Sequence, residues 1–428
     1  MGSPTAVPGK CARFLRERGQ NVDRDTRSYP TLRTEPPHFY RYPHGAGTPT
    51  LVHMKLRTSN PLRIAQVSPL YESVPPKLYG GTERVVSYLT EELVEQGHEV
   101  TLFASGDSVT TARLIPCCTK SLRLDTNCVD QIAHHFAMLD KVREHAVRDE
   151  FDVVHFHIDY FHFPVSRAYR IPHVTTLHGR LDLPDLLPLY RRYPDMPVVS
   201  ISQAQRRPLP SANWIGNVYH GLPENSLQLG GGNGRYLAFL GRICPEKRVD
   251  RAIEIAAKTG LQLKIAAKID KVDRDYFESE IKHLLKQPGV EYLGEISEDL
   301  KSEFLGNASA LLFPIDWPEP FGLAMIEAMA CGTPTLAFRC GSVPEIVSPL
   351  AGRIVNTMDE AISAVEDLLT TDRLAVRRAF LARFTASRMA QDYVSLYESI
   401  ANVREASAAK SPLALSHPKP QVEEHLLL

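Results

Sequence analysis

The sequence predicts an α/β protein with two doubly wound domains that face a central cleft. Short apolar strands alternate with amphipathic helices along most of the chain, which is typical of parallel sheets covered by helices. A stretch rich in Pro and Gly interrupts this alternation, which then starts again. The 428 residues also exceed the usual size of one domain. In open α/β sheets ligands bind at the carboxyl ends of the strands, so function is sought in the loops that follow them.

Changes in composition place the domain boundaries. The first residues mix Pro, Gly, Arg and Thr without a helical or strand period, and the last ones are rich in Pro, Ser and Ala. We predict, in chain order, a disordered extension over 1–54, a first domain over 55–222, a hinge over 223–234, a second domain over 235–386, a last helix over 387–402 and a disordered tail over 405–428. For the extension an arginine-rich targeting segment is the alternative, which its acidic residues weaken.

Charge and cysteine content exclude several classes of protein. Lys and Arg number 49 against 50 Asp and Glu, so nothing favours a nucleic-acid partner. The 7 cysteines form no CxxC pair or His/Cys cluster, which argues against a disulfide framework or structural zinc. No apolar run reaches the ~18 residues of a membrane span. We expect a cytoplasmic protein and leave peripheral membrane contact open.

The first domain begins with strand 62–68 and a long loop. Helix 82–97 follows, with its apolar residues on one face and Gly97 as its stop, and strand 98–104 returns. The alternation continues with elements predicted at 130–148 (helix) and at 152–157, 173–178, 197–201 and 214–219 (strands).

The second domain repeats the pattern. Its predicted strands are 236–241, 261–267, 290–294, 310–314 and 333–338, and its predicted helices are 249–260, 275–287 and 297–305. A further helix belongs to the stretch 316–334.

The stretch 316–334 reads DWPEPFGLAMIEAMACGTP and holds two carboxylates in an apolar setting. Its helix is apolar on all sides except at Glu327, and such a helix is normally buried. Two prolines keep Glu319 in the preceding loop. Phe321, Gly322 and Leu323 form the predicted first turn, whose backbone amides can bind an anion. A ligand with hydroxyls and a phosphate fits this pattern. The alternatives are an ion pair for Glu327 and ordinary loop exposure for Glu319.

Gly80 and Gly81 stand after the first strand and open a helix. They allow close backbone approach to an anion, although a tight turn is an equally good explanation. The GxGxxG spacing is absent, which argues against a nicotinamide enzyme.

Arg242 and Lys247 flank the loop after strand 236–241, in the sequence GRICPEK. Two cations at a strand's carboxyl end can bind a diphosphate from two sides, whereas the alternative is solvated surface charge. The acidic run of Asp270, Asp273 and Asp275 is interpreted as a solvated loop rather than a metal site.

Three histidines end strands of the first domain. His155 and His157 alternate along one strand, and His178 ends the next. Such residues are candidates for contacting sugar hydroxyls or stabilising charge. A metal site of His155, His157 and Asp159 is a weaker alternative.

Over roughly 62–402 the chain resembles the family 4 glycosyltransferases, which are retaining enzymes with the GT-B fold of two Rossmann-like domains. The motifs are Gly-Gly after the first strand, TLHG, GRICPEK, and EPFGLAMIE with its Glu-x7-Glu spacing. The last two in this order make the combination specific. One departure is NVYHGL, where His220 occupies a position at which the family often has Asn; this puts interdomain hydrogen bonding in doubt.

The resemblance implies a role for each matched residue. Arg242 and Lys247 would hold the donor diphosphate, and Glu319 would contact the hydroxyls of the transferred sugar. Glu327 would bind the ribose, and His178 would lie by the transferred sugar. The remaining donor contacts would be Gly80 and Gly81 at the phosphates, the amides of Phe321, Gly322 and Leu323, and Glu295 and Ile296 at the base. The helix 387–402 would cross back to complete the first domain.

We therefore expect a hexosyltransferase that uses a nucleoside-diphosphate sugar, with retention and without a metal ion or other cofactor. Arg242, Lys247 and a helix N-terminus would supply the positive charge that a cation supplies elsewhere. The acceptor, whether a sugar, a lipid or a small molecule, stays unknown. The alternatives are another GT-B enzyme, such as a phosphorylase or epimerase, and a non-catalytic nucleotide-sugar-binding protein.

Overall fold

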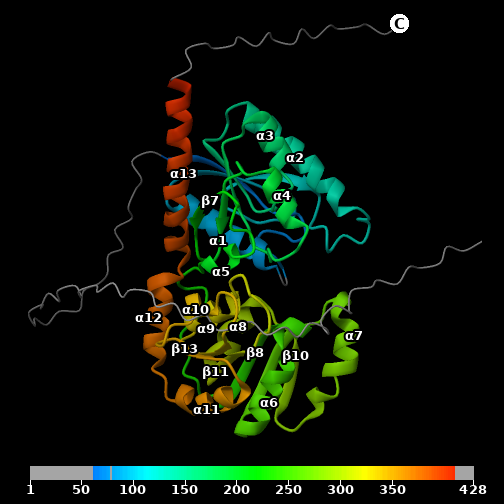
Figure 1. Cartoon of the computed structure of the whole chain (residues 1–428), viewed down its shortest axis with the longest axis vertical. Coiled ribbons are helices and arrows are strands. Elements are labelled where there is room, and N and C mark those ends of the chain that lie inside the picture. Colours follow the sequence, from blue (N-terminus) through cyan, green and yellow to red (C-terminus); the bar gives the residue numbers. More distant parts are fainter. Residues whose placement is uncertain (1–60, 78–79, 410–428) are drawn as a thin grey trace, which may run out of the picture. The chain divides into compact units, whose positions relative to one another are not determined.

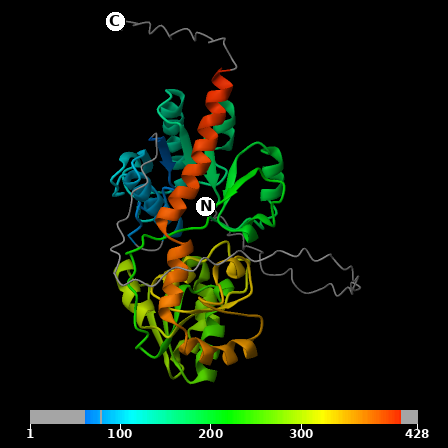
Figure 2. The ribbon, with the colours of Figure 1, turned by 90° about the vertical axis from the view of Figure 1, so that its left-hand side faces the viewer.

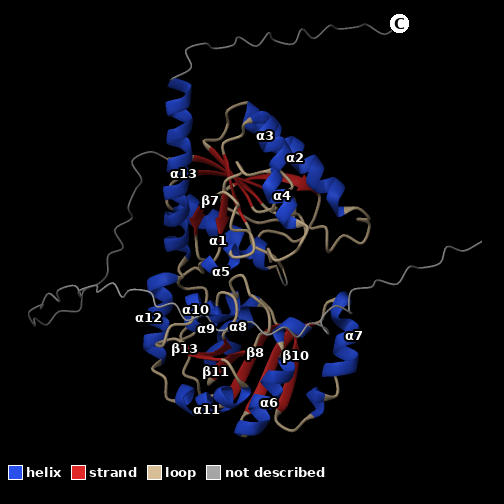
Figure 3. Ribbon diagram, in the orientation of Figure 1, coloured by secondary structure: helices blue, strands red, loops and turns tan. Residues whose placement is uncertain are grey.

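The computed structural model describes residues 61–77 and 80–409, which form two parallel sheets flanked by helices (Figures 1 and 3). The predicted extension 1–54 lies outside the described residues, as does 410–428. The domain boundaries drawn from the sequence stay predictions. No helix within the described ranges is both long and apolar enough to cross a membrane.

The first sheet has seven parallel strands in the order β3-β2-β1-β4-β5-β6-β7. Their bounds are Arg63–Val67 (β1), Glu99–Ser105 (β2), Arg113–Cys118 (β3), Val153–Phe156 (β4), His173–Thr176 (β5), Val198–Ser200 (β6) and Trp214–Asn217 (β7). The inner strands are buried on both faces because helices cover both sides, and they include buried polar residues such as Gln66, His155 and Thr175. Strand β3 was not predicted. It carries Pro116 and is half exposed at the edge of the sheet, which is where a strand tolerates proline.

Helices α1 (Gly81–Glu95) and α2 (Gln131–Val147) confirm the two predicted for this half. Gly97 has φ of 96° just beyond α1, so it does end that helix. The Asp130 side chain caps α2 by accepting from the backbone amides of Ile132 and Ala133. Three shorter helices were not predicted, namely Phe163–Tyr169 (α3), Leu186–Arg192 (α4) and Gln203–Arg206 (α5).

The second sheet has six parallel strands in the order β10-β9-β8-β11-β12-β13. Their bounds are Tyr236–Arg242 (β8), Gln262–Lys268 (β9), Val290–Gly294 (β10), Ala310–Phe313 (β11), Thr335–Phe338 (β12) and Gly352–Val355 (β13). The first five match predicted strands, whereas the short edge strand β13 was missed. The helices around this sheet are Val249–Thr259 (α6), Arg274–Tyr276 (α7), Glu298–Asn307 (α8), Leu323–Ala330 (α9), Val343–Ile346 (α10), Met358–Leu369 (α11) and Arg373–Arg383 (α12).

The predicted helix over 275–287 is largely helical but irregular. The segment contains the short helix α7, a π turn at Phe277–Ile281 and a 3-10 turn at Leu284–Lys286. At ~100° per residue its apolar side chains would cover about half of the circumference of an ideal helix. The wider turn gathers them onto the core beside β8 and β9. Helices α10, α11 and α12 were missed, although Thr357 and Glu360 form a recognisable cap at the start of α11.

The last helix, α13 (Ala386–Ala409), extends into the segment predicted to be a disordered tail, so residues 405–409 are helical. It follows the second sheet in the chain but packs on the first, as its red ribbon shows (Figure 2). Tyr393 and Tyr397 are buried there. The Tyr397 hydroxyl lies 2.7 Å from His155 Nδ1, and the Tyr393 hydroxyl lies 2.7 Å from Thr176 Oγ1. This polar contact fixes α13 on β4 and β5.

Several histidines of the first half are buried without charge. Burial lowers the pKa of His155, His157, His162 and His220 well below the ordinary value. His162 makes hydrogen-bond contacts of 2.8 Å with Ser166 Oγ and 2.7 Å with Thr175 Oγ1, so its neutral ring is fully paired.

The first prediction concerns acid stability. Histidines in the unfolded chain have a pKa of ~6.5, so below that pH the unfolded chain takes up protons that the folded chain does not bind. The free energy of unfolding should therefore fall as the pH falls from 7 to 5. The fall should be smaller in His162→Gln by roughly 1–2 kcal/mol. Urea titrations at both pH values measure it, with the exposed His283→Gln as control. An equal fall in wild type and His162→Gln would contradict the prediction.

Candidate functional site

A cavity of about 520 Å³ lies between the carboxyl ends of strands from both sheets. It is lined from the first half by loops after β1, β4 and β5 and by the start of α1, and from the second half by β8, β9, β11 and the start of α9. Every residue to which the family resemblance assigns a donor or sugar contact lines it, namely Gly80, Gly81, His178, Arg242, Lys247, Glu295, Ile296, Glu319, Phe321, Gly322, Leu323 and Glu327. The structure thus brings them together, while their roles stay predictions.

Glu327 is the buried carboxylate of α9, and two cations bind it. Its Oε1 lies 2.6 Å from Lys301 Nζ and 3.3 Å from Arg84 Nη1. Burial alone would raise the pKa of Glu327, but Lys301 and Arg84 hold that pKa below its ordinary value. Glu327 therefore forms an ion pair, which was the alternative to a binding role in the sequence analysis. Both contacts reach the same oxygen, and within the described residues Oε2 has no hydrogen bond.

The partners of Glu327 come from opposite sides of the cavity. Lys301 lies on α8 beside the second sheet, whereas Arg84 lies on α1 beside the first. Glu298 joins the cluster, at 2.9 Å from each of these cations. This four-residue ion-pair cluster connects the two sides of the cavity. Neither cation was predicted from the sequence. A helical stretch of mixed charge does not show which of its charged residues contacts a glutamate far away in the chain.

Glu319, which precedes α9 in the chain, is likewise held through only one of its two carboxylate oxygens. Its Oε2 forms an ion pair with Lys247 Nζ and accepts a hydrogen bond from Trp317 Nε1 at 3.0 Å. Glu319 is only 8% exposed, so the alternative of ordinary loop exposure is wrong. The loop is held from behind, where the Ser342 amide donates to the Glu319 carbonyl at 3.0 Å. Within the described residues Oε1 has no hydrogen bond.

Helix α9 begins two residues later than predicted. Gly322 is its N-cap, with φ of 84°, so Phe321 and Gly322 precede the helix and only Leu323 lies in its first turn. A Cβ at position 322 would come within 2.7 Å of Met325, which together with the left-handed backbone requires glycine. Leu323 and Ala324, the first two residues of α9, line the cavity, and the first amides of a helix have no partner within it.

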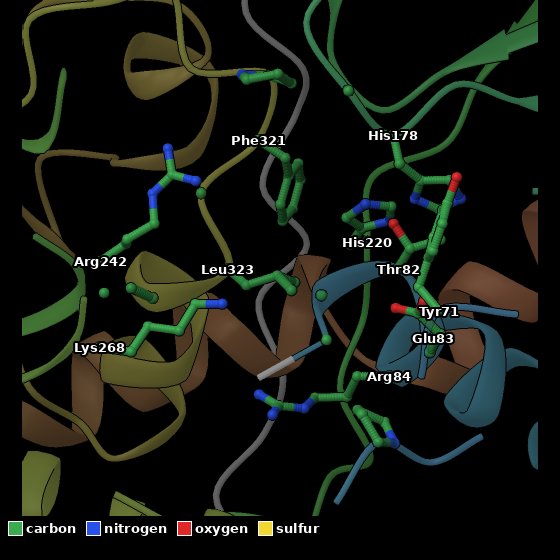
Figure 4. Close-up of a pocket in the computed structure, with 18 of the residues that line it drawn as sticks. Tyr71, Thr82, Glu83, Arg84, His178, His220, Arg242, Lys268, Phe321 and Leu323 are labelled. Carbon is green, nitrogen blue, oxygen red and sulfur yellow. The ribbon is translucent and has the colours of Figure 1, made fainter. Parts of the chain in front are cut away.

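Arg242 is held by the acidic loop that follows β9. Its side chain lies 3.3 Å from both Asp270 and Asp273, and Lys268 lies 2.9 Å from Asp270. The interpretation of this acidic run as a solvated loop is wrong for these two residues, since they orient Arg242 at the cavity. Lys268, which was not predicted, lines the cavity beside Arg242 (Figure 4).

Of the three predicted histidines, His157 and His178 line the cavity. His157 Nδ1 lies 2.9 Å from His178 Nε2, and His157 Nε2 lies 2.8 Å from Gln66 Oε1. Burial lowers the pKa of His178 to about 3, so the ring is neutral at pH 7. His155 does not line the cavity: both its nitrogens contact hydroxyls, those of Tyr397 and Thr176.

The alternative of a metal site at His155, His157 and Asp159 is therefore wrong. In the part of the chain that the structure describes, no three His, Cys, Asp or Glu side chains gather as metal ligands would.

His220, the departure noted in the sequence, lies at the junction of the two sides. Its ring stacks on His178 with centroids 5.2 Å apart and meets Phe321 edge-on at 4.8 Å (Figure 4). Its carbonyl accepts a hydrogen bond from Arg388 of α13 at 3.2 Å. The contact between the sides here is thus mainly aromatic packing.

Two family models match successive parts of the chain. Residues 79–214 match Glycosyltransferase Family 4, and residues 228–380 match Glycosyl transferases group 1. This chain belongs to glycosyltransferase family 4. The enzyme is a glycosyltransferase, and the resemblance based on GRICPEK and EPFGLAMIE is confirmed.

Relatives and solved structures agree with this glycosyltransferase assignment. The chain is 25% identical over 334 residues to an uncharacterized glycosyltransferase of Methanocaldococcus jannaschii, covering 67% of this chain and 83% of the relative. It is 25% identical over 370 residues to N-acetyl-alpha-D-glucosaminyl L-malate synthase of Bacillus anthracis, covering 75% and 94%. The structure of Anabaena HepE in complex with UDP-glucose superimposes with a TM-score of 0.60 at 16% identity, covering 81% of this chain and 100% of that one. The two-sheet architecture is the GT-B fold.

The second prediction tests the ion pairs of Glu327. Lys301→Met should lower the free energy of unfolding by on the order of 3 kcal/mol, because it removes the closer partner of a buried carboxylate. The double variant Lys301→Met/Glu327→Met should recover most of that loss. Urea unfolding of both variants at pH 7 measures it. A stable single variant, or a double variant as unstable as the single one, would contradict the prediction.

Proposed function

We propose that this glycosyltransferase transfers a hexose from a nucleoside-diphosphate sugar to an acceptor hydroxyl, with retention at the anomeric carbon and without a metal ion. The observation that carries the proposal is the shared geometry of Glu319 and Glu327. In each carboxylate one oxygen binds cationic or N–H donors, and the other has no hydrogen bond within the described residues. A fixed carboxylate with an open oxygen is suited to accept hydrogen bonds from sugar hydroxyls.

The diphosphate would lie between the two carboxylates. Arg242 and Lys247 line this part of the cavity, as do Leu323 and Ala324 at the start of α9. Arg can bind two phosphate oxygens at once, and a helix N-terminus adds partial positive charge. Asp270, Asp273 and Glu319 hold the two side chains in place before the donor arrives. Little reorganisation is then needed when charge develops on the departing phosphate.

The sugar and the ribose would lie on opposite sides of the diphosphate. Glu319, next to Lys247, would accept from hydroxyls of the transferred hexose, so one ion pair orients both the sugar and the leaving group. Glu327 would accept from the ribose through Oε2. Gly80 and Gly81 would pack against the phosphates from the first half, and Glu295 and Ile296 would lie by the base.

Retention is consistent with the chemistry of the nearby groups. Burial lowers the pKa of His178 to about 3, so its neutral ring binds a proton too weakly to serve as the general base. The departing phosphate would then take the proton of the acceptor hydroxyl on the same face of the sugar. Arg242 and Lys247 stabilise the negative charge that this phosphate gains.

The relatives support a nucleotide-sugar donor. The solved structure of HepE contains UDP-glucose, and the Bacillus anthracis relative is named for the transfer of an N-acetylglucosaminyl group to malate. Nucleoside-diphosphate hexoses are therefore the first donors to test.

The third prediction is the donor assay. Purified protein should release nucleoside diphosphate from one of a panel of UDP-, GDP- and ADP-hexoses, and EDTA should leave the rate unchanged. Arg242→Gln and Lys247→Met should each lower the rate by roughly 10²–10³-fold, as expected when one donor to a developing anion is removed. Lys258→Met, an exposed lysine on α6, is the matched control. Activity that EDTA abolishes, or that survives both substitutions, would refute the proposal.

A further inference from the structure

One carboxylate that does not line the cavity connects the two halves of the enzyme. Glu345 lies on α10, which follows β12 of the second sheet, and it reaches the start of α5, which follows β6 of the first sheet. Both helices lie at the junction between the halves (Figure 1). Glu345 Oε2 accepts from the Gln203 amide and Oε1 accepts from the Ala204 amide, each at 2.7 Å. Each carboxylate oxygen thus holds one backbone amide of the other half.

Further contacts fix Glu345 itself. The Tyr219 hydroxyl, from the segment after β7, donates to Glu345 Oε2 at 3.0 Å. On the other side, Arg383 of α12 donates to the Glu345 carbonyl at 2.6 Å, and its guanidinium lies 5.8 Å from the centroid of the Tyr219 ring. The half-buried carboxylate therefore has three donors, all from the first half, while its own backbone is held by the second half.

Helix α5 passes this contact on to the loop that carries His178. The side-chain nitrogen of Gln205, on α5, donates to the Leu177 carbonyl at 2.8 Å and to the Gly179 carbonyl at 2.9 Å. Its Oε1 accepts from the Ile201 amide at 3.0 Å, and the side chain is buried. The two carbonyls that Gln205 binds flank His178 in the chain. The position of α5 therefore sets the position of this cavity-lining histidine.

The start of α10 also holds the loop on the donor side of the cavity. Ser342 comes directly before α10 and is fully buried. Its amide donates to the Glu319 carbonyl at 3.0 Å, and its hydroxyl donates to the Phe321 carbonyl at 2.8 Å. One short segment thus contacts the loop of Glu319 through Ser342 and the start of α5 through Glu345.

We propose that Glu345 is a positioning residue for sugar transfer, which acts through α5 and Gln205 to set the His178 ring relative to the hexose that Glu319 binds. A carboxylate offers two acceptor oxygens to the two neighbouring amides, whereas the side chain of Gln offers one oxygen and an NH₂ group. Glu345 itself would touch no substrate. The inference rests on the proposed function, in which His178 lies by the transferred hexose.

The fourth prediction is a loss of rate without a loss of nucleotide binding. Glu345→Gln should lower kcat for donor hydrolysis roughly tenfold or more, because a small displacement of a group at the reacting sugar is costly. Calorimetry should show affinity for the nucleoside diphosphate of that donor within about twofold of wild type, since the contacts of Arg242, Lys247 and Glu327 do not involve α5. Glu366→Gln, an exposed acid on α11, is the matched control.

A double-mutant cycle separates positioning from a general effect on the fold. His178→Gln removes the ring that Glu345 positions, so adding Glu345→Gln to it should change kcat by less than about twofold. An equal loss of kcat in both backgrounds, an unchanged kcat in Glu345→Gln alone, or a loss of nucleotide affinity as large as the loss of kcat would overturn the inference.

If the wild type hydrolyses no donor, the proposed function fails, and NMR then tests the positioning by itself. In spectra of protein with isotope-labelled histidine, the ring signal of His178 is the one that His178→Gln removes. Glu345→Gln should shift this signal, and Glu366→Gln should leave it in place. A His178 signal at the wild-type position in Glu345→Gln, or equal shifts of every histidine signal, would refute the inference whatever the activity.

Discussion

The cavity depends on one constraint, the burial of the Glu327 carboxylate inside an apolar helix. A buried carboxylate is tolerated only with partners, and here these are Lys301 and Arg84. The two cations come from helices on opposite sides of the cavity, so satisfying the charge also joins the α1 side to the α9 side. The ion pair that stabilises the fold therefore positions a carboxylate that has a free oxygen for a ligand.

The same principle organises the rest of the site. Lys247 and Trp317 orient Glu319, and Asp270 and Asp273 orient Arg242. Charged side chains are thus held by neighbours before any ligand binds.

Sequence reasoning found the parts of the site that are continuous in the chain. The apolar setting of Glu327, the prolines around Glu319 and the loop from Arg242 to Lys247 carry local signals. Glu327, Glu319, Arg242 and Lys247 all line the cavity. Lys301 and Arg84 carry no such local signal, because the sequence of an amphipathic helix shows its charged residues but not the residues that they contact.

The fold was predictable to a similar degree and for a related reason. Most strands read as short apolar runs and were predicted, including the partly exposed edge strands β7 and β10. The strands that escaped notice are β3, which is half exposed and carries Pro116, and the four-residue β13. The apolar side chains of 275–287 pack in one core with β8 and β9, and the local sequence pattern does not show the irregular helical turns of this segment.

The central claim is that Glu327 and the Arg242–Lys247 pair bind the two ends of a nucleotide. A crystal structure with the nucleoside diphosphate of the preferred donor tests this most directly. The predicted result places the diphosphate within hydrogen-bond distance of Arg242 and Lys247 and the ribose hydroxyls on Glu327 Oε2, in crystals grown with a chelator. A nucleotide whose ribose lies away from Glu327, or whose diphosphate touches neither cation, would contradict it.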